Sequence, residues 1–187
     1  MTDALRIAVI IASSRPRRVG PTVADWVMLA AGARTGATYE LIDLADEGLP
    51  NLDEPEPAST GTYSKAHTRA WSEKVASYDG FVFVTPEYNH GIPGQLKNAL
   101  DFLYEEWADK AAGIVSYGSS SAGSRAAESL KPLLSALAIA VVREQLVVSL
   151  GDDMKDGEME PRPPLAETLN KVLTSVERWA GVLRQLR

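Results

Sequence analysis

The sequence contains no cysteine and only two histidines among its 187 residues. Without cysteine the chain has no disulfides, no thiolate metal sites and no cysteine nucleophile or redox dithiol. His67 and His90 are far apart, and no H-x-x-E or H-x-x-x-H spacing occurs, so a metal enzyme is poorly supported. Any redox chemistry must therefore come from a bound cofactor.

Long apolar runs and excess positive charge are also missing. No apolar run reaches the roughly 18 residues that suggest a membrane-spanning helix. The start of the chain, MTDALRIAVII, is acidic before a short apolar run, unlike the basic start of a signal peptide. The formal net charge of -6 argues against general binding to nucleic acid, although it leaves room for a local anion site. We expect a cytoplasmic protein with no nucleic-acid or membrane partner.

Three nucleotide and hydrolase motifs are absent too. The sequence lacks the G-x-x-x-x-G-K-[ST] motif of P-loop enzymes and the G-x-G-x-x-G dinucleotide fingerprint. The segment YGSSSAG does not match the G-x-S-x-G elbow of a serine hydrolase. A mononucleotide phosphate remains as a candidate ligand.

Segments with the apolar pattern of a buried strand alternate along the chain with segments whose apolar residues have helical spacing. Short runs rich in Val or Ile predict buried strands at residues 5–12, 80–85, 111–117 and 140–150, and a weaker run at 38–44 is expected nearer an edge. Helical spacing of apolar residues occurs around 23–30, 64–78, 96–103, 130–137 and 165–186, and residues 48–62 and 151–164 look like irregular loops. This alternation, with 45% hydrophobic content, predicts one doubly wound α/β domain over residues 1–187 with a five-stranded parallel sheet and helices on both faces.

Three arginines, Arg15, Arg17 and Arg18, stand directly after the first expected strand, in the segment ASSRPRRVGPTV. Ligands of open parallel sheets bind beyond the carboxyl ends of the strands. A helix is expected to begin near Pro21 and Thr22, and the free N–H groups at its start favour an anion. The segment therefore predicts a phosphate cradle, and the alternative is a solvated surface cluster of arginines.

Two further loops are expected at the same edge of the sheet. TPEYNHGIPGQLKNALDFL follows the strand at 80–85, and its glycines and prolines break regular structure around residues 87–90. YGSSSAGSRAAESL, rich in glycine and serine, leads into the next helix. Backbone amides held in the first of these loops could approach a flat ring.

On these three segments the chain resembles the NADPH-dependent FMN reductases with a flavodoxin-like fold, and the resemblance runs over most of the chain. It implies the strand order 2-1-3-4-5, bound FMN, and NADPH or NADH as co-substrate. The implied activity is an NAD(P)H oxidoreductase that passes electrons to a small-molecule acceptor, such as a flavin, a quinone, an azo compound or a metal oxyanion. Two departures are Ala12, where the family usually has glycine, and Arg17, where glycine is common.

The resemblance also implies which residues form the site. The phosphate would be held by Ser13, Arg15 and Arg18 with the backbone amides of Thr22 and Val23. The isoalloxazine ring would be lined by Pro86, Glu87, Tyr88, Asn89 and His90, and flanked at its other edge by Ser116 and Gly118. No side chain need act as an acid or base and no metal is expected, while Tyr88 could shape the substrate slot. Arg17 is left as a surface charge or as a rim group for the phosphate of NADPH.

Two other functions stay open at this point. A flavodoxin-like electron carrier would bind FMN without nicotinamide turnover, but such carriers have a T/S-x-T-G-x-T phosphate loop, and the arginines favour the reductase. A flavin-binding sensor or partner protein is the other alternative.

Family members are typically homodimers or dimers of dimers. In this chain the stripe of Leu96, Leu100, Leu103, Tyr104 and Trp107 looks too broad for one buried face. We therefore predict that part of this stripe is buried between subunits.

Overall fold

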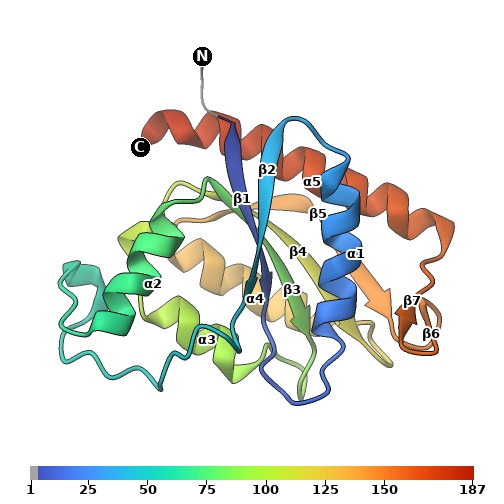
Figure 1. Ribbon diagram of the computed structural model, residues 1–187, viewed down its shortest axis with the longest axis horizontal. Helices are drawn as coiled ribbons and strands as arrows, with labels where there is room; N and C mark the ends of the chain where they lie inside the picture. Colours follow the sequence, from blue (N-terminus) through green and yellow to red (C-terminus); the bar gives the residue numbers. More distant parts are fainter. Residues whose placement is uncertain (1–3) are drawn as a thin grey trace.

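A five-stranded parallel sheet with the order β2-β1-β3-β4-β5 forms the centre of the molecule (Figure 1). The computed structural model describes residues 4–187. The strands are β1 (Leu5–Ile11), β2 (Ala37–Asp43), β3 (Gly80–Pro86), β4 (Ala111–Gly118) and β5 (Ala140–Ser149). The expected flavodoxin-like order is confirmed, and the weaker run at 38–44 is the edge strand β2.

Helices cover both faces of the sheet, as the alternation of elements predicts. One face carries α1 (Gly20–Gly32) and α5 (Pro163–Leu183), and the other carries α2 (Ala66–Ala76), α3 (Gly94–Asp101) and α4 (Ser124–Ala136) (Figure 1). Strands β3 and β4 are buried along their whole length, because the side chains on both faces of the sheet pack against helices. Two hydrophobic clusters, one on each side of the sheet, make up the core.

The segment 151–164 is more regular than expected. It contains the two-stranded antiparallel hairpin of β6 (Met154–Lys155) and β7 (Glu158–Met159). Asp156 and Gly157, with φ of 52° and 87°, form the turn between them. The loop at 48–62 has only one turn of 3-10 helix, η1 (Ala58–Thr60).

The stripe at 96–107 corrects the prediction about its burial. Helix α3 ends at Asp101, and a separate 3-10 turn, η2 (Glu105–Trp107), carries Trp107 back toward the sheet. Its indole packs edge to face on Phe81, with ring centroids 5.0 Å apart. Leu96, Leu100, Leu103 and Trp107 are each 1% exposed in the single chain, and Tyr104 alone is exposed. The stripe is therefore core of one subunit, and the expectation that it is too broad for one buried face is wrong.

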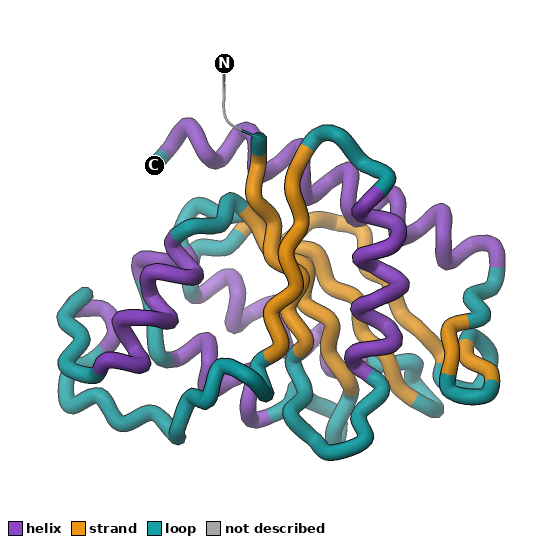
Figure 2. Tube along the Cα trace, in the orientation of Figure 1, coloured by secondary structure: helices purple, strands orange, loops and turns teal. Residues whose placement is uncertain are grey.

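The register of the strands brings three loops to one edge. Ile11 of β1 pairs with Val84 of β3, and Pro86 of β3 pairs with Tyr117 of β4. The segments that follow β1, β3 and β4 consequently leave the sheet at the same level (Figure 2). The chain turns outward to β2 on one side of β1 and to β3 on the other, which makes this edge the topological switch point of the sheet.

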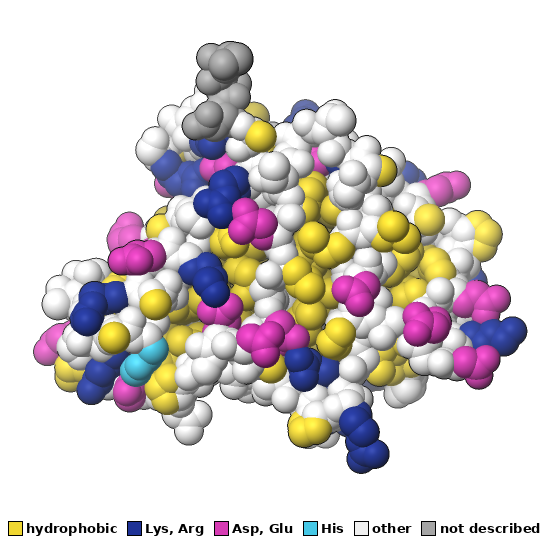
Figure 3. Space-filling model, in the orientation of Figure 1, with side chains coloured by type: hydrophobic (Ala, Val, Ile, Leu, Met, Phe, Trp, Pro, Cys, Tyr) yellow, Lys and Arg dark blue, Asp and Glu magenta, His cyan; other side chains and the backbone are white. Residues whose placement is uncertain are grey.

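Within residues 4–187, no helix combines the length and apolarity needed to cross a bilayer. On the face seen in Figure 3, basic and acidic side chains alternate over the surface rather than gathering into a patch of one sign.

Candidate functional site

The loop after β1 and the loop after β3 are tied together by side chains. Ser13, fully buried, shares a hydrogen bond of 2.8 Å between its Oγ and the Oη of Tyr88. Arg15 joins both partners, because its backbone N–H donates to Ser13 Oγ at 3.3 Å and its Nε donates to Tyr88 Oη at 3.3 Å. The structure thus brings together three residues of the two sets that the sequence assigned to phosphate and to ring.

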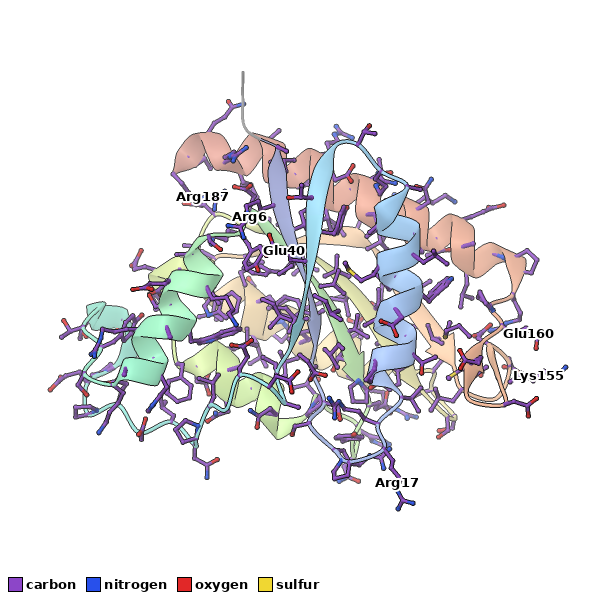
Figure 4. The ribbon with its side chains drawn as sticks, in the orientation of Figure 1. Arg6, Arg17, Glu40, Lys155, Glu160 and Arg187 are labelled. Atoms are coloured by element: carbon purple, nitrogen blue, oxygen red, sulfur yellow. The ribbon has the colours of Figure 1, made fainter. Side chains whose placement is uncertain are left out.

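The other two arginines of the first loop have different surroundings. Arg18 is partly buried, and its Nη2 donates to Asp43 Oδ2 at the end of β2. Its Nε is buried without a hydrogen-bond partner among residues 4–187. Arg17 is exposed, has a left-handed backbone with φ of 56°, and extends from the loop into solvent (Figure 4). Only Arg15 and Arg18 therefore remain close to the other site residues.

The first turn of α1 supplies backbone donors. Its first helical hydrogen bond runs from the N–H of Val23 to the carbonyl of Val19 at 3.2 Å, and Pro21 has no N–H. The N–H groups of Gly20 and Thr22 are consequently left for another acceptor. The amide of Val23 is already used, and the side chain of Thr22 borders a separate hollow beside Trp26 and Glu158.

The loop after β3 forms a tight two-residue hairpin turn. Tyr88 and Gly91 exchange two backbone hydrogen bonds of 3.0 Å. Asn89 and His90, between them, have φ of 49° and 67°, the pattern of a type I′ turn. Their side chains are exposed, and their N–H groups make no hydrogen bond within the described chain. Two strained residues thus present free amides at the edge of the sheet.

Glu87 stabilises the neighbouring helix. Its carboxylate accepts from the backbone N–H of Arg125 at 3.0 Å and from the Arg125 guanidinium at 3.1 Å. Burial opposes its ionisation, but hydrogen bonds from Ser121, Arg125 and Ala126 outweigh burial and lower the pKa of this carboxyl. The N–H of Glu87 donates to the carbonyl of Tyr117 at 3.0 Å. Glu87 thus ties the loop after β3 to the loop after β4 without offering a free donor.

The third loop is shaped by close backbone contact. Gly123 has φ of 85°, and a Cβ there would lie 2.5 Å from the backbone N of Tyr117. At Gly118 a Cβ would lie 2.9 Å from the N of Gly123. Ser116 is fully buried in β4, and its hydroxyl donates to the carbonyl of Leu146 on β5 at 3.4 Å. Of the two residues expected at the far edge of the ring, Gly118 borders the cavity described next and Ser116 does not.

A cavity of 150 Å³ lies where the three loops meet. Its lining residues are Arg15, Val19, Pro86, Glu87, Tyr88, Tyr117, Gly118, Ser119 and Leu150. A larger hollow of 510 Å³ lies at the opposite edge of the sheet, beside Leu5, Gly36 and Gly181, away from the three loops.

Sequence reasoning missed four of these lining residues, Val19, Tyr117, Ser119 and Leu150. For Tyr117 a signal existed, because it is the single aromatic residue in the strand AAGIVSYG and lies next to its carboxyl end. Its ring is 3% exposed, and its hydroxyl has no hydrogen-bond partner in the part of the chain that the structure describes.

Comparison with known proteins assigns the chain to a family. The model of the NADPH-dependent FMN reductases matches residues 5–153. The chain belongs to this family. An NAD(P)H-dependent FMN reductase of Schizosaccharomyces pombe is 40% identical over 184 residues, covering 97% of this chain and 90% of the relative. The chain is accordingly an oxidoreductase that uses FMN and NAD(P)H.

Two further matches extend the comparison. A 2-hydroxy-1,4-benzoquinone reductase of a Burkholderia species is 34% identical over 116 residues, which is 59% of this chain and 56% of that protein. The flavoenzyme NAD(P)H:(acceptor) oxidoreductase FerB of Paracoccus denitrificans has the same fold, with a TM-score of 0.75 and 19% identity over 95% of this chain and 98% of that one.

The residues of the site fit FMN. Arg18 has a buried Nε without a partner in the described chain, which a phosphate oxygen would satisfy. A Cβ on Gly20 would lie 2.9 Å from Ile11 Cγ2, so glycine is needed where the chain enters the helix at the phosphate subsite. The free amides of Asn89 and His90 stand at the same edge as donors for the carbonyl and nitrogen atoms of a flavin ring.

Proposed function

We propose that this reductase is a single-domain enzyme over residues 1–187 that holds FMN at the β1/β3 switch point, oxidises NAD(P)H there and reduces a flavin or a quinone. The observation that carries the proposal is the junction of the three loops, where Ser13, Arg15 and Tyr88 are hydrogen-bonded to one another beside the cavity. When bound, FMN supplies the redox chemistry, accepting hydride and passing electrons on.

In this proposal the first loop binds the phosphate. Arg15 and Arg18 provide charge-assisted hydrogen bonds, Ser13 provides a hydroxyl, and the start of α1 provides the N–H of Thr22. The Val23 amide is not included, because it already donates within the helix. Asp43 holds Arg18 from the side of β2, which fixes the direction of the guanidinium.

The second loop orients the ring. The N–H groups of Asn89 and His90 are held rigidly by the two Tyr88–Gly91 hydrogen bonds. Donors fixed in this way stabilise negative charge that develops at the pyrimidine end of a reduced flavin. Pro86 and Tyr88 border the ring, Glu87 positions the loop through α4, and Gly118 lies at the other edge. No protein side chain acts as an acid or base in this scheme.

For the acceptor, a flat two-electron acceptor suits the site best. The loops that surround the cavity are short and leave the edge of the sheet open, so a planar ring can follow the nicotinamide at the same face. The benzoquinone reductase among the relatives supports a quinone. Azo compounds and metal oxyanions are the other candidate acceptors.

The test is the visible spectrum of the purified protein with and without FMN, followed by anaerobic titration with NADPH and then with NADH. We expect flavin absorbance that shifts on binding, bleaches on titration and returns when a benzoquinone is added. A flavin that binds and fails to bleach would mark an electron carrier or a sensor instead. A protein that does not bind FMN would refute the proposed phosphate site.

We also propose that the reductase is cytoplasmic and forms a homodimer or a dimer of dimers. The assembly is supported by the typical state of the family and by apolar side chains left outside the core, such as Leu29, Trp179 and Val182, which are 78%, 49% and 58% exposed. We expect sedimentation velocity to give a dimer or larger species at micromolar concentration. A monomer there would contradict the proposal.

A further inference from the structure

Tyr117 is the penultimate residue of β4, and its ring lies inside the molecule beneath the start of α1. The residue pairs with Pro86 of β3 on one side and with Val148 of β5 on the other. Its ring is 3% exposed and belongs to the hydrophobic cluster between the sheet and the helices α1 and α5. The backbone of Tyr117 is fixed by the hydrogen bond from Glu87. The hydroxyl of this ring lies close to Gly20, at the end of the loop that follows β1.

The hydroxyl of Tyr117 is buried without a hydrogen-bond partner among residues 4–187. Two other tyrosines of the fold have partners, because Tyr39 donates to Glu177 at 2.8 Å and Tyr78 donates to Glu40 at 2.9 Å. Leaving a buried hydroxyl unpaired costs stability, and native proteins avoid this cost unless a ligand or water completes the bond. We therefore expect the hydrogen-bond partner of this hydroxyl to come from outside the chain.

Its surroundings indicate what that partner is. A Cβ on Gly20, the first residue of α1, would lie 3.0 Å from Tyr117 Oη, so the hydroxyl lies at the helix N-terminus. Tyr117 also borders the cavity together with Arg15. Arg18 carries another buried donor, Nε, that has no partner among residues 4–187. Two unpaired donors and the start of a helix suit an acceptor with several oxygens and a negative charge.

We propose that the hydroxyl of Tyr117 donates a hydrogen bond to the phosphate of FMN, as a binding residue beyond those in the arginine loop. This inference rests on the proposed function of that loop. Burial, with a smaller contribution from Tyr88, raises the pKa of Tyr117, so the phenol keeps its proton at neutral pH and can act as a donor. Tyr117 and Arg18 would add their donors to those of Ser13, Arg15 and the Thr22 amide in holding the phosphate.

The test compares Tyr117→Phe with Tyr78→Phe, a buried tyrosine whose hydroxyl is partnered. Both variants keep the ring and so keep the packing. FMN and riboflavin are titrated into each flavin-free protein by quenching of flavin fluorescence, since riboflavin has the same ring and ribityl chain but no phosphate. We expect Tyr117→Phe to weaken FMN at least about 10-fold and riboflavin less than about 2-fold, as expected for a lost hydrogen bond to a charged group. Tyr78→Phe should leave both affinities unchanged.

Thermal melting of the flavin-free proteins gives the second readout. Tyr117→Phe should melt at or above the wild-type temperature, because it removes an unpaired buried hydroxyl, while Tyr78→Phe should melt lower. The proposal is overturned if Tyr117→Phe loses FMN and riboflavin equally, loses neither, or melts lower by as much as the control. If the wild type binds riboflavin as tightly as FMN, no phosphate site exists, and the proposed function of the arginine loop fails with it.

Discussion

Arg18 is the cation of the phosphate loop most restricted by its neighbours. It is held by Asp43, and its buried Nε is unpaired within the described chain, whereas Arg17 lies in solvent one residue earlier. We expect Arg18→Gln to weaken FMN by about 10- to 100-fold, the range for a hydrogen bond to a charged group, with little change for riboflavin. Equilibrium dialysis of both ligands measures this, and Arg17→Gln is the matched control. Equal losses in the two variants would mean that only the overall charge of the loop matters.

Gly123 is the residue whose replacement should damage the site without touching a ligand. Its φ of 85° disfavours any side chain, and a Cβ there would collide with the backbone N of Tyr117 at 2.5 Å. Gly123→Ala should lower the free energy of unfolding by about 3 kcal/mol or more, the sum of the backbone and overpacking costs. Gly48→Ala, with φ of 61° and nothing within 4 Å, isolates the backbone cost of about 1–2 kcal/mol. If the two variants unfolded at similar urea concentrations, the proposed steric clash at Gly123 would be refuted.

For single residues, the sequence predicts which types of residue surround the site better than it predicts the hydrogen bonds that each of them makes. Arg15, Tyr88 and Gly118, three of the residues that the resemblance assigns to the cofactor, border the cavity. The amide of Val23, expected at the phosphate, already donates within the helix, and the hydroxyl of Ser116, a residue expected at the edge of the ring, already donates across the sheet. The acceptors of these two hydrogen bonds are the carbonyls of Val19 and Leu146, and neither residue belongs to a recognisable sequence motif. No pattern in the sequence could have predicted them.

Among the elements, α4 contains a proline in its interior. Pro132 has no N–H to donate to the preceding turn, and its side chain is exposed. Pro132→Ala should raise the free energy of unfolding by about 1–3 kcal/mol, since proline is about 3 kcal/mol less favourable than alanine inside a helix. Chemical denaturation checks this. Pro164→Ala, in the first turn of α5 where proline fits, should bring no such gain, and an equal gain there would contradict the explanation.

The hairpin of β6 and β7 and the end of α3 are the elements that the sequence reading missed. The Asp156–Gly157 pair is a strong type I′ signal, but the flanking strands have two residues each, too short for any periodicity to appear. In α3, helical spacing of apolar residues continues past Asp101, although the chain leaves the helix and returns as the 3-10 turn of Trp107. Spacing alone could not separate these two cases, since both bury the same side chains.

For the molecule as a whole, Lys110, directly before β4, ties the end of α2 to the sheet. Its side chain is 2% exposed, and its Nζ donates to the carbonyls of Val75 at 2.7 Å and Ala76 at 3.3 Å, at the end of α2. Burial, together with the charge of Arg187, lowers its pKa from 10.5 to about 7. Between these pH values the unfolded chain holds the extra proton, so the free energy of unfolding rises with pH.

We therefore expect the stability of the wild type relative to Lys110→Met to increase by up to about 3 kcal/mol from pH 7 to pH 9.5, at about 1.4 kcal/mol per pKa unit. Urea unfolding at several pH values measures both proteins, and the subtraction removes the titration of the tyrosines. A constant difference across this range would show that Lys110 stays protonated in the folded protein.

The layered architecture could be predicted from the sequence because it depends on composition along the chain. Buried strands of Val and Ile alternating with helical stripes leave few arrangements for a chain with right-handed crossovers. The cavity could not be predicted, since it depends on contacts between loops that are far apart in the sequence, such as Ser13 with Tyr88.

Helix α5 has a consequence for the limits of the folding unit. The family match ends at residue 153, yet Val172, Val176 and Ala180 beyond it are fully buried against the sheet. Val172 occupies the space left by Gly113, where a Cβ would lie 2.6 Å from its Cγ1. A chain cut after residue 153 would keep every residue assigned to the cofactor and lose the cover of one sheet face. The segment that contains the cofactor residues is thus shorter than the segment that the protein needs in order to fold.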